Sequence, residues 1–468
     1  MNQNAAFTSG SLFRHITVAS FTSSVGLMAI FAVDLIDLLF ISVLGIDELA
    51  AAAGYASTVM FFASSINIGT AIATSALVST AVGAGDEKLA RERATSFAAL
   101  TIVVGIVVPV LILLNVDWLV AQLGAEGAVA TKAVGYLWIV IPFTIFSGLS
   151  MVAVSMLRAH GDVKIAMYPS IFGAITNAVL DPILIFALGL GLPGAAWATA
   201  VARVVTFAFA MYPALKTYKA FAWPELGFIM REMVNVLRFT LPAVVANMAF
   251  PVGMAILTWT ASRYGSEAVA GMAIVLRILP VAFAVARAAP GAIAPIIGQN
   301  YGASNMERVR QAYLDGIKFS ALYVLAIMLL LFIFRQQVAD LFSATGETRE
   351  MILFFCSPLC TGVFFTCVIA IGNGALNSLG RPMLSPWIDW GRNTIGTLPF
   401  VLIGPQLLGG PEGILLGYVT GGAIFAGCSY WLMVRTIDSI EESQKPEANR
   451  VGTSKYGHSD AFDKSVGM

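Results

Sequence analysis

Apolar residues dominate the chain in long runs, and short segments rich in glycine, proline and charged residues separate the runs. A helix needs roughly 20 mostly apolar residues to cross the hydrocarbon core of a bilayer. Several runs are much longer than this, so their helices must tilt or extend beyond the hydrocarbon layer. The pattern predicts an all-α membrane protein with twelve spans, at about 16–44, 49–81, 94–114, 130–156, 163–189, 193–215, 233–262, 267–297, 309–334, 350–378, 384–407 and 413–435.

Composition supports the membrane assignment. Hydrophobic residues make up 58% of the 468 positions and charged residues 12%, against about 25% charged residues in a soluble domain. The formal net charge is zero, whereas a nucleic-acid partner would require a basic excess. The first run starts near Phe13 and is longer than the apolar part of a secretory signal. No small-residue cleavage site follows it, so it predicts the first span.

No set of residues indicates an enzyme, a metal site or ATP coupling. The three histidines fall at a membrane edge, in a loop and in the C-terminal tail, which gives no catalytic constellation. The turn at Gly83–Gly85 lacks the Gly-Lys-Ser of a phosphate-binding loop. We expect no catalytic residues, no cofactor and no structural metal. We expect packing roles for the four cysteines, Cys356, Cys360, Cys367 and Cys428.

Lysine and arginine are distributed unevenly among the predicted loops, and in membrane proteins they accumulate on the cytoplasmic side. Twelve spans place both termini on one side. If that side is the cytoplasm, 19 of the 27 Lys and Arg residues are cytoplasmic, four are external and four lie within spans. We therefore expect a multi-pass inner-membrane protein with cytoplasmic termini, and a disordered cytoplasmic tail over 437–468.

The two halves of the chain repeat one another. Glycines that follow corresponding spans recur at offsets of 217 to 220 residues: Gly45 and Gly265, Gly85 and Gly302, Gly161 and Gly380, Gly194 and Gly413. Duplication is common in transporters, and six spans per half, an even number, give both halves the same orientation. We expect an N-terminal six-helix lobe over 1–215, a cytoplasmic linker over 216–232 and a C-terminal six-helix lobe over 233–436.

Polar positions inside the spans show where the repeat breaks down. A carboxylate at the centre of a span costs about 2.5–3.5 kcal/mol on insertion, so groups that packing does not require are candidates for function. The N-terminal half has polar groups where the other half is apolar or bulky: Asp37 aligns with Leu257, Asp181 with about Phe400, Asn177 with about Gly396, and Thr199 with about Tyr418.

The spacing of these groups predicts a shared cluster. Asn177 and Asp181 lie on one helix face at i, i+4, and Asp34 and Asp37 lie on one face of the first span at i, i+3. Pro182 removes a helix hydrogen bond directly after the second pair and leaves a carbonyl free. Neighbouring carboxylates in a low dielectric cannot all ionise easily, so the set should hold a proton or bind Na⁺. The alternative is hydrogen-bonded contacts that only hold helices together.

The chain resembles the multidrug and toxic compound extrusion (MATE) family over about 12–436. The resemblance depends on the order and spacing of several short motifs. They are Asp-Leu-Leu-Phe-Ile-Ser-Val-Leu-Gly from Asp37, Gly-Ala-Gly-Asp from Gly83, Leu-Arg-Ala-His-Gly-Asp from Leu157, Asn-Ala-Val-Leu-Asp-Pro from Asn177, Gly-Ala-Ala-Trp-Ala-Thr from Gly194, and Asn-Tyr-Gly-Ala-Ser-Asn from Asn300.

The resemblance implies twelve helices in two bundles that face each other across a V-shaped central cavity, and export driven by H⁺ or Na⁺. It also implies a cation site in the N-terminal lobe. In the family this site is formed by a first-span Asp, matched here by Asp37, and by a fifth-span Asn and Asp, matched by Asn177 and Asp181. A sixth-span Thr, matched by Thr199, lines it.

Two departures from the family pattern bear on the coupling. Acids that serve Na⁺ coupling in some members are missing from the seventh span, and the tenth offers only Asn373, so coupling should depend on the N-terminal lobe. A proline that many members carry about fifteen residues before the first-span Asp is Thr22 here, although the second half keeps Pro242. First-helix bending through that proline is therefore not expected.

Charged residues in the C-terminal half allow alternative interpretations. Asp389 and Arg392 are spaced i, i+3 in the eleventh span, so they either pair with each other, which we favour, or contact substrate together with Asn373. Arg277 and Arg287 in the eighth span either reach the membrane interface or pair with acids elsewhere.

Taken together, these features predict a monomeric cation-coupled antiporter that exports amphipathic, often cationic, drug-like organic compounds by alternating access. H⁺ is expected rather than Na⁺, although Na⁺ could also bind at Asp37, Asn177 and Asp181. Asp34 and Thr199 are expected to complete the site. The alternatives are a flippase of a lipid-linked precursor and a passive channel.

Overall fold

The computed structural model describes residues 5–43 and 47–444, without the side chains at 34, 35, 38, 39, 41–43, 47, 50 and 444. Every regular element in this part of the chain is a helix. The first half contains α1 (Leu12–Val43), α2 (Asp47–Gly83), α3 (Glu87–Leu114), α4 (Val116–Gln122), α5 (Gly127–Val140), η1 (Ile141–Phe143), α6 (Thr144–Ala159), α7 (Val163–Pro182), η2 (Ile183–Ala187) and α8 (Leu192–Lys216). The second half contains α9 (Leu226–Ser262), α10 (Ser266–Ala282), α11 (Ala284–Gly302), α12 (Met306–Ile333), α13 (Arg335–Leu341), α14 (Gly346–Phe355), η3 (Pro358–Thr361), α15 (Gly362–Ser378), α16 (Leu384–Asn393), α17 (Leu398–Leu408) and α18 (Glu412–Gln444).

The twelve-span architecture is confirmed, with two broken spans that the hydrophobic pattern did not show. Within the described residues, ten helical segments are each long and apolar enough to cross a membrane, and α10 and α11 form an eleventh span bent by 54°. The predicted span at 384–407 consists of two short helices, α16 and α17. Between them Thr394 departs from helical geometry, and Gly396 lies against Phe425 of α18.

The duplication is visible in the backbone. Both halves place a seven-residue helix, α4 or α13, after their third span. Asp86 and Asn305 each cap the following helix by accepting a hydrogen bond from the backbone N–H three residues later. The preceding residues, Gly85 and Ser304, both have a positive φ, 75° and 57°. Ser304, and not the predicted Gly302, is therefore the counterpart of Gly85. Gly45 lies outside the described residues.

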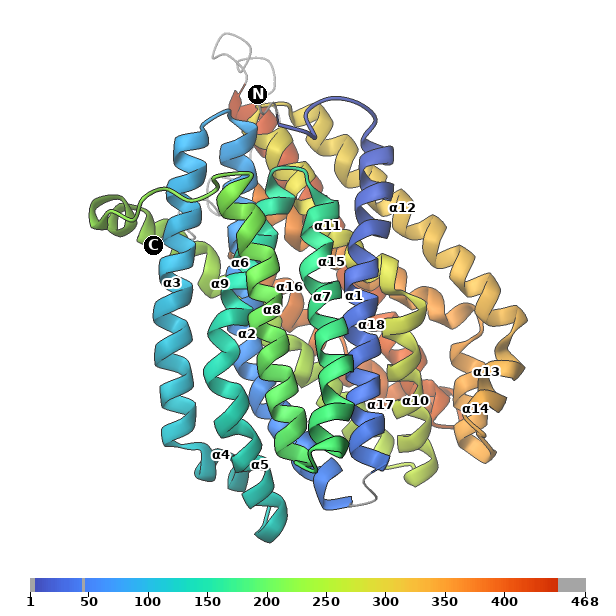
Figure 1. The fold of residues 1–468 in the computed structure, drawn as a ribbon. Helices are drawn as coiled ribbons and strands as arrows, with labels where there is room; N and C mark the ends of the chain where they lie inside the picture. Colours follow the sequence, from blue (N-terminus) through green and yellow to red (C-terminus); the bar gives the residue numbers. More distant parts are fainter. Residues whose placement is uncertain (1–4, 44–46, 445–468) are drawn as a thin grey trace.

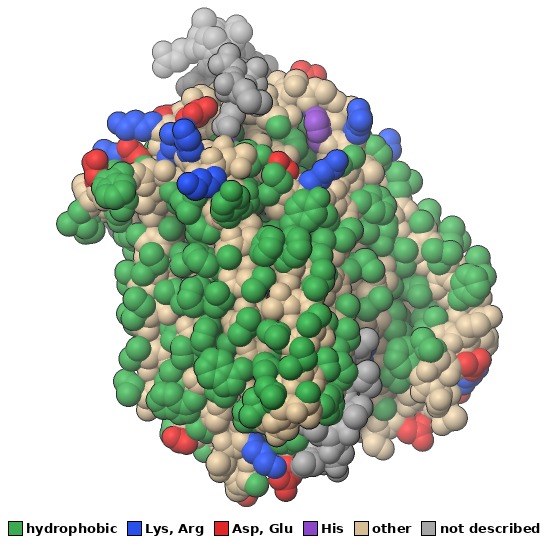
Figure 2. Space-filling view, viewed as in Figure 1, with side chains coloured by type: hydrophobic (Ala, Val, Ile, Leu, Met, Phe, Trp, Pro, Cys, Tyr) green, Lys and Arg blue, Asp and Glu red, His purple; other side chains and the backbone are tan. Residues whose placement is uncertain are grey.

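The molecule is a bundle of helices (Figure 1), and a hydrophobic belt separates its two charged ends (Figure 2). Green apolar side chains cover the middle of the face shown in Figure 2, and Lys, Arg, Asp and Glu gather above and below. The start of α1 and the last turns of α18 lie at one end, uppermost in both views. Both contact the first turns of α12, where Arg308 donates to Phe7 and Arg310 pairs with Asp438. We call this the terminal end.

Two predicted boundaries were wrong at this end. The tail was expected to begin at 437, but α18 continues to Gln444 because Ile437 is buried and Arg310 forms ion pairs with Asp438 at 2.5 Å and Glu441 at 3.1 Å. The linker was expected to reach 232, but α9 already begins at Leu226. The first turns of α9 form ion pairs with α3, and these pairs stabilise the helix before the apolar run starts.

The two lobes pack tightly against each other at the terminal end. The last turns of α2 lie against the last turns of α11. Both helices carry glycine where they meet, because a Cβ at Gly83 would overlap the carbonyl oxygen of Gln299, and one at Gly302 would overlap the carbonyl oxygen of Thr80. The protein is therefore closed at this end in the conformation described.

The segment before α1 is bound into the same closure. The Phe7 side chain is buried, and its backbone N–H donates to the Gln299 side chain at 2.8 Å. The Gln299 amide in turn donates to the carbonyl of Ala159 at the end of α6, at 2.7 Å. Asn300 and Arg308 both donate to the Phe7 carbonyl, each at 3.1 Å. One buried glutamine thus joins the N-terminal segment, the first lobe and the second lobe.

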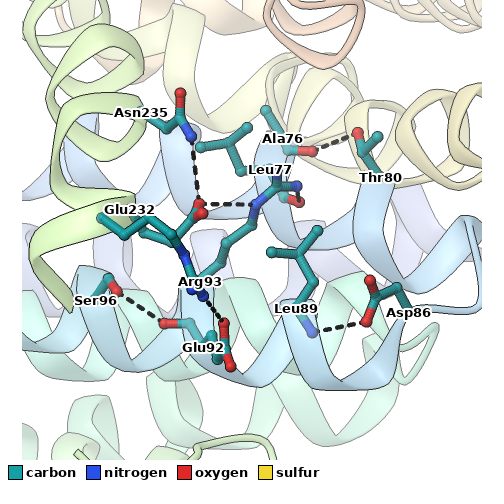
Figure 3. A network of polar contacts seen from close by, with 11 residues as sticks. Ala76, Leu77, Thr80, Asp86, Leu89, Glu92, Arg93, Ser96, Glu232 and Asn235 are labelled. Carbon is teal, nitrogen blue, oxygen red and sulfur yellow. Dashed lines mark hydrogen bonds and ion pairs between the residues drawn. The ribbon is translucent and has the colours of Figure 1, made fainter. Parts of the chain in front are cut away.

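A reciprocal pair of ion pairs also crosses between the lobes at this end (Figure 3). Arg93 of α3 contacts Glu232 of α9 at 3.4 Å, and Arg231 of α9 contacts Glu92 of α3 at 2.8 Å. Arg93 also donates to the Leu77 carbonyl at 2.9 Å, which connects the pair to α2. Both carboxylates are buried, so breaking a pair leaves an uncompensated charge.

The Arg93–Glu232 pair should contribute measurably to stability. We expect Glu232→Gln to lower the unfolding free energy by about 1–3 kcal/mol, because a hydrogen bond to a buried charge is lost. The measurement is thermal unfolding of the purified protein in detergent. Glu87→Gln is the control, since its pair with Arg91 is exposed on both sides and should contribute less than about 1 kcal/mol. An equal effect of the two substitutions would contradict the assignment.

Candidate cation-binding site

Three helices of the first lobe meet closely around the predicted cluster. α1 packs along α7, and α7 packs along α8. The contact between α7 and α8 requires glycine at position 173, because a Cβ there would overlap the Thr206 hydroxyl. This close approach places the polar residues of α7 beside those of α8, in helices that are otherwise apolar.

Asp181, Asn177 and the half-buried Asp37 form one cluster. Asp181 is fully buried and Asn177 is 4% exposed. With its amide nitrogen facing the carboxylates, Asn177 donates to Asp181 Oδ2 at 2.5 Å and to Asp37 Oδ1 at 2.8 Å. We assign this orientation because the opposite one would aim the amide oxygen at two acceptors. The i, i+4 pairing of Asn177 with Asp181 and its meeting with Asp37 thus follow the sequence prediction.

Thr199 lies on the other side of the same amide. Its hydroxyl is within 3.4 Å of the Asn177 side chain. In the assigned orientation the amide oxygen faces this hydroxyl, which can donate to it. The side chain of Asp34, the fifth predicted member, lies outside the described residues.

One carboxylate oxygen of the cluster has no hydrogen-bond donor. Asp181 Oδ1 is buried without a partner among the described residues. The Asp37 and Asp181 carboxyls nevertheless lie side by side, since the Asn177 amide donates to both. Two carboxyl oxygens can form a hydrogen bond only if one of them carries a proton. The arrangement is therefore incomplete without a proton or another cation.

The helix geometry changes directly after Asp181. α7 ends at Pro182, and the chain continues as a π-helix, η2, over Ile183–Ala187. Proline has no N–H to donate to the preceding turn, and π-helical turns inside membrane helices often occur at functional sites. The predicted disturbance after Pro182 is present, and it takes the form of this wider turn.

Two residues of the site were missed by the sequence prediction. Tyr136 of α5 lies beside Thr199 and within electrostatic range of Arg203, Asp37 and Asp181. Arg203 of α8 donates to the carbonyl of Val140 at 2.9 Å. Comparison of the two halves could have identified both residues, since the position that corresponds to Tyr136 holds Phe355 and the one that corresponds to Arg203 holds Gly422. The N-terminal half again carries the polar member.

The predicted substrate residues of the second lobe form a separate group. Asn373 donates to Asp389 Oδ2 at 2.9 Å. Arg392 is 5% exposed, donates to Thr366 at 3.0 Å and to Tyr418 at 2.7 Å, and lies over the Tyr418 ring. The preferred pairing of Asp389 with Arg392 was wrong. The two residues share a helix face but turn to different neighbours, and no ion pair joins them.

Neither lobe offers a set of ligands for a resident transition metal. In the part of the chain that the structure describes, no three His, Cys, Asp or Glu side chains come together. Cys356, Cys360 and Cys367 are buried, and Cys428 is exposed. The chemistry available to the first-lobe cluster is therefore binding and release of a proton or a small oxygen-seeking cation.

The fold and this cluster can now be compared with known proteins. The family model MatE matches residues 23–183 and 242–388, about two thirds of the chain. The chain belongs to the MatE family. The two matched segments begin 219 residues apart, which is the offset of the duplication, and the first of them contains the cluster of Asp37, Asn177 and Asp181.

Named relatives of this MatE protein include several exporters. It is 26% identical over 450 residues to the FAD transporter of Shewanella oneidensis, covering 94% of this chain and 98% of that protein. It is 24% identical to the probable multidrug resistance protein NorM of Thermotoga maritima, over 72% of this chain and 74% of that one. The multidrug export protein MepA of Staphylococcus aureus is 23% identical over 60% and 62%.

Solved structures share the whole fold. A multidrug resistance MATE family transporter described in an outward-facing conformation superposes with a TM-score of 0.87 at 24% identity, over 94% of this chain and 99% of that one. A transporter of the same superfamily from Pyrococcus furiosus, described as having reversed polarity in its binding pocket, has a TM-score of 0.86. The protein is thus a multi-pass membrane transporter of the MATE multidrug efflux type, not an enzyme.

Proposed function

We propose that this MatE protein is an antiporter of the inner membrane that exports amphipathic organic compounds in exchange for H⁺. The terminal end faces the cytoplasm in this proposal, as the distribution of Lys and Arg suggests, and the protein works as a monomer. The observation that carries the proposal is Asp181, a fully buried carboxyl within a membrane helix, which touches Asp37 and has one oxygen without a partner.

In the arrangement without a metal ion, the orientation assigned to Asn177 suits H⁺. Na⁺ requires several oxygen ligands, but the amide presents its nitrogen to both carboxylates and its oxygen to Thr199. The space between the acids is therefore lined by two carboxyl groups and an N–H donor. Such a set suits a shared proton better than a metal ion with a full oxygen shell.

Coupling follows from a difference in proton affinity between two conformations. A proton can drive a conformational change only to the extent that it binds one state better than the other. Asp37 lies on α1 while Asn177 and Asp181 lie on α7, so a movement of α1 against α7 would change the contact between the acids. Protonation from outside would favour the state that releases substrate, and proton release to the cytoplasm would restore the state that takes it up.

Two classes of substrate remain as candidates. The relatives named as multidrug proteins suggest drug-like amphipathic compounds, often cations. The relative named as an FAD transporter suggests aromatic compounds with an anionic phosphate group. Arginines at membrane depth that lack a partner, described below, favour the second class.

The coupling ion can be tested in everted membrane vesicles. With a pH gradient, acid inside, and no Na⁺, we expect concentrative uptake of a fluorescent amphipathic compound that collapses when a protonophore is added. A Na⁺ gradient at uniform pH should drive none. Uptake that requires Na⁺ would contradict proton coupling, and flux that follows only the compound's own gradient would indicate a channel. Vesicles without the protein provide the baseline.

A further inference from the structure

Two arginines of the broken span lack the partners that charges inside a membrane protein usually have. Arg277 on α10 and Arg287 on α11 are both exposed. Neither forms a hydrogen bond or an ion pair with any residue that the structure describes. Of the two alternatives for these arginines, pairing with acids elsewhere is therefore not seen among the described residues.

The surface around these arginines does not resemble a lipid-facing surface. The exposed positions of α10 from residue 270 and of α11 follow one stripe, made of Ala270, Ala273, Arg277, Val281, Arg287 and Gly291. By contrast, the exposed positions of α3 are mostly large aliphatic residues, such as Ile106, Val110 and Leu114. Apart from Val281, this face consists of alanine, glycine and arginine, which suits a polar space between the lobes rather than acyl chains.

Arg287 lies too deep in the membrane span for its side chain to reach the membrane interface. The residue lies fifteen positions before Gly302, the end of α11. At 1.5 Å per residue this is roughly 22 Å along the helix, in a hydrocarbon core about 30 Å thick. Arginines near helix ends can extend to the interface, but this one is near the middle of the span.

A third arginine reaches the same face from the other lobe. Arg158 lies in the last turn of α6, and its Nη1 is 3.5 Å from where a Cβ at Gly291 would be. Gly291 is one helical turn from Arg287 on the same side of α11, and no other atom approaches it within 4 Å. The Nε of Arg158 is buried without a hydrogen-bond partner. The guanidinium of Arg158 therefore lies over α11 beside the Arg287 face.

We propose that Arg158 and Arg287 together form an inter-lobe site for an anionic group of the exported compound, a carboxylate, phosphate or sulfonate. Both guanidinium groups present free N–H donors, and planar donor pairs match the geometry of such anions. Three acids described near the middle of the spans are held elsewhere, since Asp37 and Asp181 form the coupling cluster and Asp389 is bound by Asn373. An anion would supply the missing negative charge.

The position of the site between the lobes gives it a role in release. Arg158 belongs to the first lobe and Arg287 to the second, so an anion bound to both stabilises the conformation in which the lobes bring the two together. A rearrangement that separates them removes one of the two cations and weakens binding. This inference rests on the proposed export function, and it specifies the charge of the substrate.

The test compares two amphipathic dyes of opposite charge, carboxyfluorescein and ethidium, in the same everted vesicles. We expect Arg287→Gln and Arg158→Gln each to reduce carboxyfluorescein transport at least about tenfold, with ethidium transport unchanged or increased. Arg287→Lys should retain part of the activity, because it keeps the charge but not the planar donors. Arg349→Gln, at the opposite end and paired with Asp340, is the control that should affect neither dye.

Binding to the purified protein separates this proposal from the coupling mechanism. Carboxyfluorescein binding in detergent, followed by fluorescence anisotropy, should weaken about tenfold in both glutamine variants while their thermal unfolding stays close to wild type. If binding and anionic selectivity do not change, the anion site is refuted. If the glutamine variants transport both dyes equally poorly and also unfold at lower temperature, the arginines have a structural role. If the wild-type protein binds carboxyfluorescein but shows no gradient-driven transport, the proton-coupled antiport is refuted and the anion site is not.

Discussion

Replacing Asp181 by Asn is expected to abolish proton-driven export while the protein remains folded in the membrane. The substitution keeps the size and hydrogen-bonding capacity of the side chain but removes the group that takes up and releases a proton. Asp181 is fully buried, and the only carboxyl described beside it, Asp37, would then have no second acid with which to share the proton. We expect uptake into everted vesicles to fall by at least about a hundredfold, the range seen when a proton-transfer group is lost.

Asp389→Asn is the matched control for this experiment. Asp389 is also a carboxyl within the membrane region, and it also accepts a hydrogen bond from an asparagine, Asn373. It lies in the second lobe, outside the coupling cluster, so its replacement should leave proton-driven transport within about twofold of wild type. Unchanged transport in Asp181→Asn at normal expression would exclude the proposed site. Equal loss in both variants would show that coupling is not confined to the first lobe.

Gly83→Ala is expected to open the closed end of the protein. The added methyl group would overlap the carbonyl oxygen of Gln299, which is backbone and cannot rotate away. Relief requires α2 and α11 to separate at the terminal end, which exposes the buried faces of both helices. Overpacking of this kind costs about 1–3 kcal/mol, enough to change a balance between two conformations roughly five-fold to over a hundredfold.

Thiol labelling can measure this opening. A cysteine introduced by Ser79→Cys lies in the contact, because Ser79 is fully buried against Gly298. In a background without the exposed Cys428, a membrane-impermeant maleimide should label it at least about fivefold faster in Gly83→Ala. Gly54→Ala, on the same helix but with open space around the added methyl, should leave the labelling rate unchanged. Equal rates in the two variants would contradict the role of Gly83.

Much of the architecture could be predicted because membrane helices depend on a simple physical requirement. Long apolar runs gave the twelve spans, and the duplication gave the two lobes. The break between α16 and α17 escaped prediction because the run 384–407 has enough apolar residues for one helix. Its interruption comes from tertiary packing of Gly396 against Phe425, which hydropathy does not encode.

The first-lobe cluster was predicted more fully than the arrangement of the second lobe. Comparison of the halves identified Asp37, Asn177 and Asp181 because unneeded buried polar groups are costly. The same comparison, applied to aromatic and basic positions, would have added Tyr136 and Arg203. Partner choice could not be predicted in this way. Helical spacing places Asp389 and Arg392 on one face, but Asn373, Thr366 and Tyr418 come from other helices and compete successfully for them.

The binding of Phe7 to Gln299 sets an order for biogenesis. The two residues are 292 positions apart, and at a synthesis rate of 5–20 residues per second Gln299 emerges roughly 15–60 s after Phe7. The first lobe can insert and fold during that interval, but the hydrogen bonds from the N-terminal segment to Gln299, Asn300 and Arg308 cannot form until the second lobe is in place. The part of the chain that is synthesised first is thus among the last to reach its final contacts, and its docking reports that both lobes have assembled.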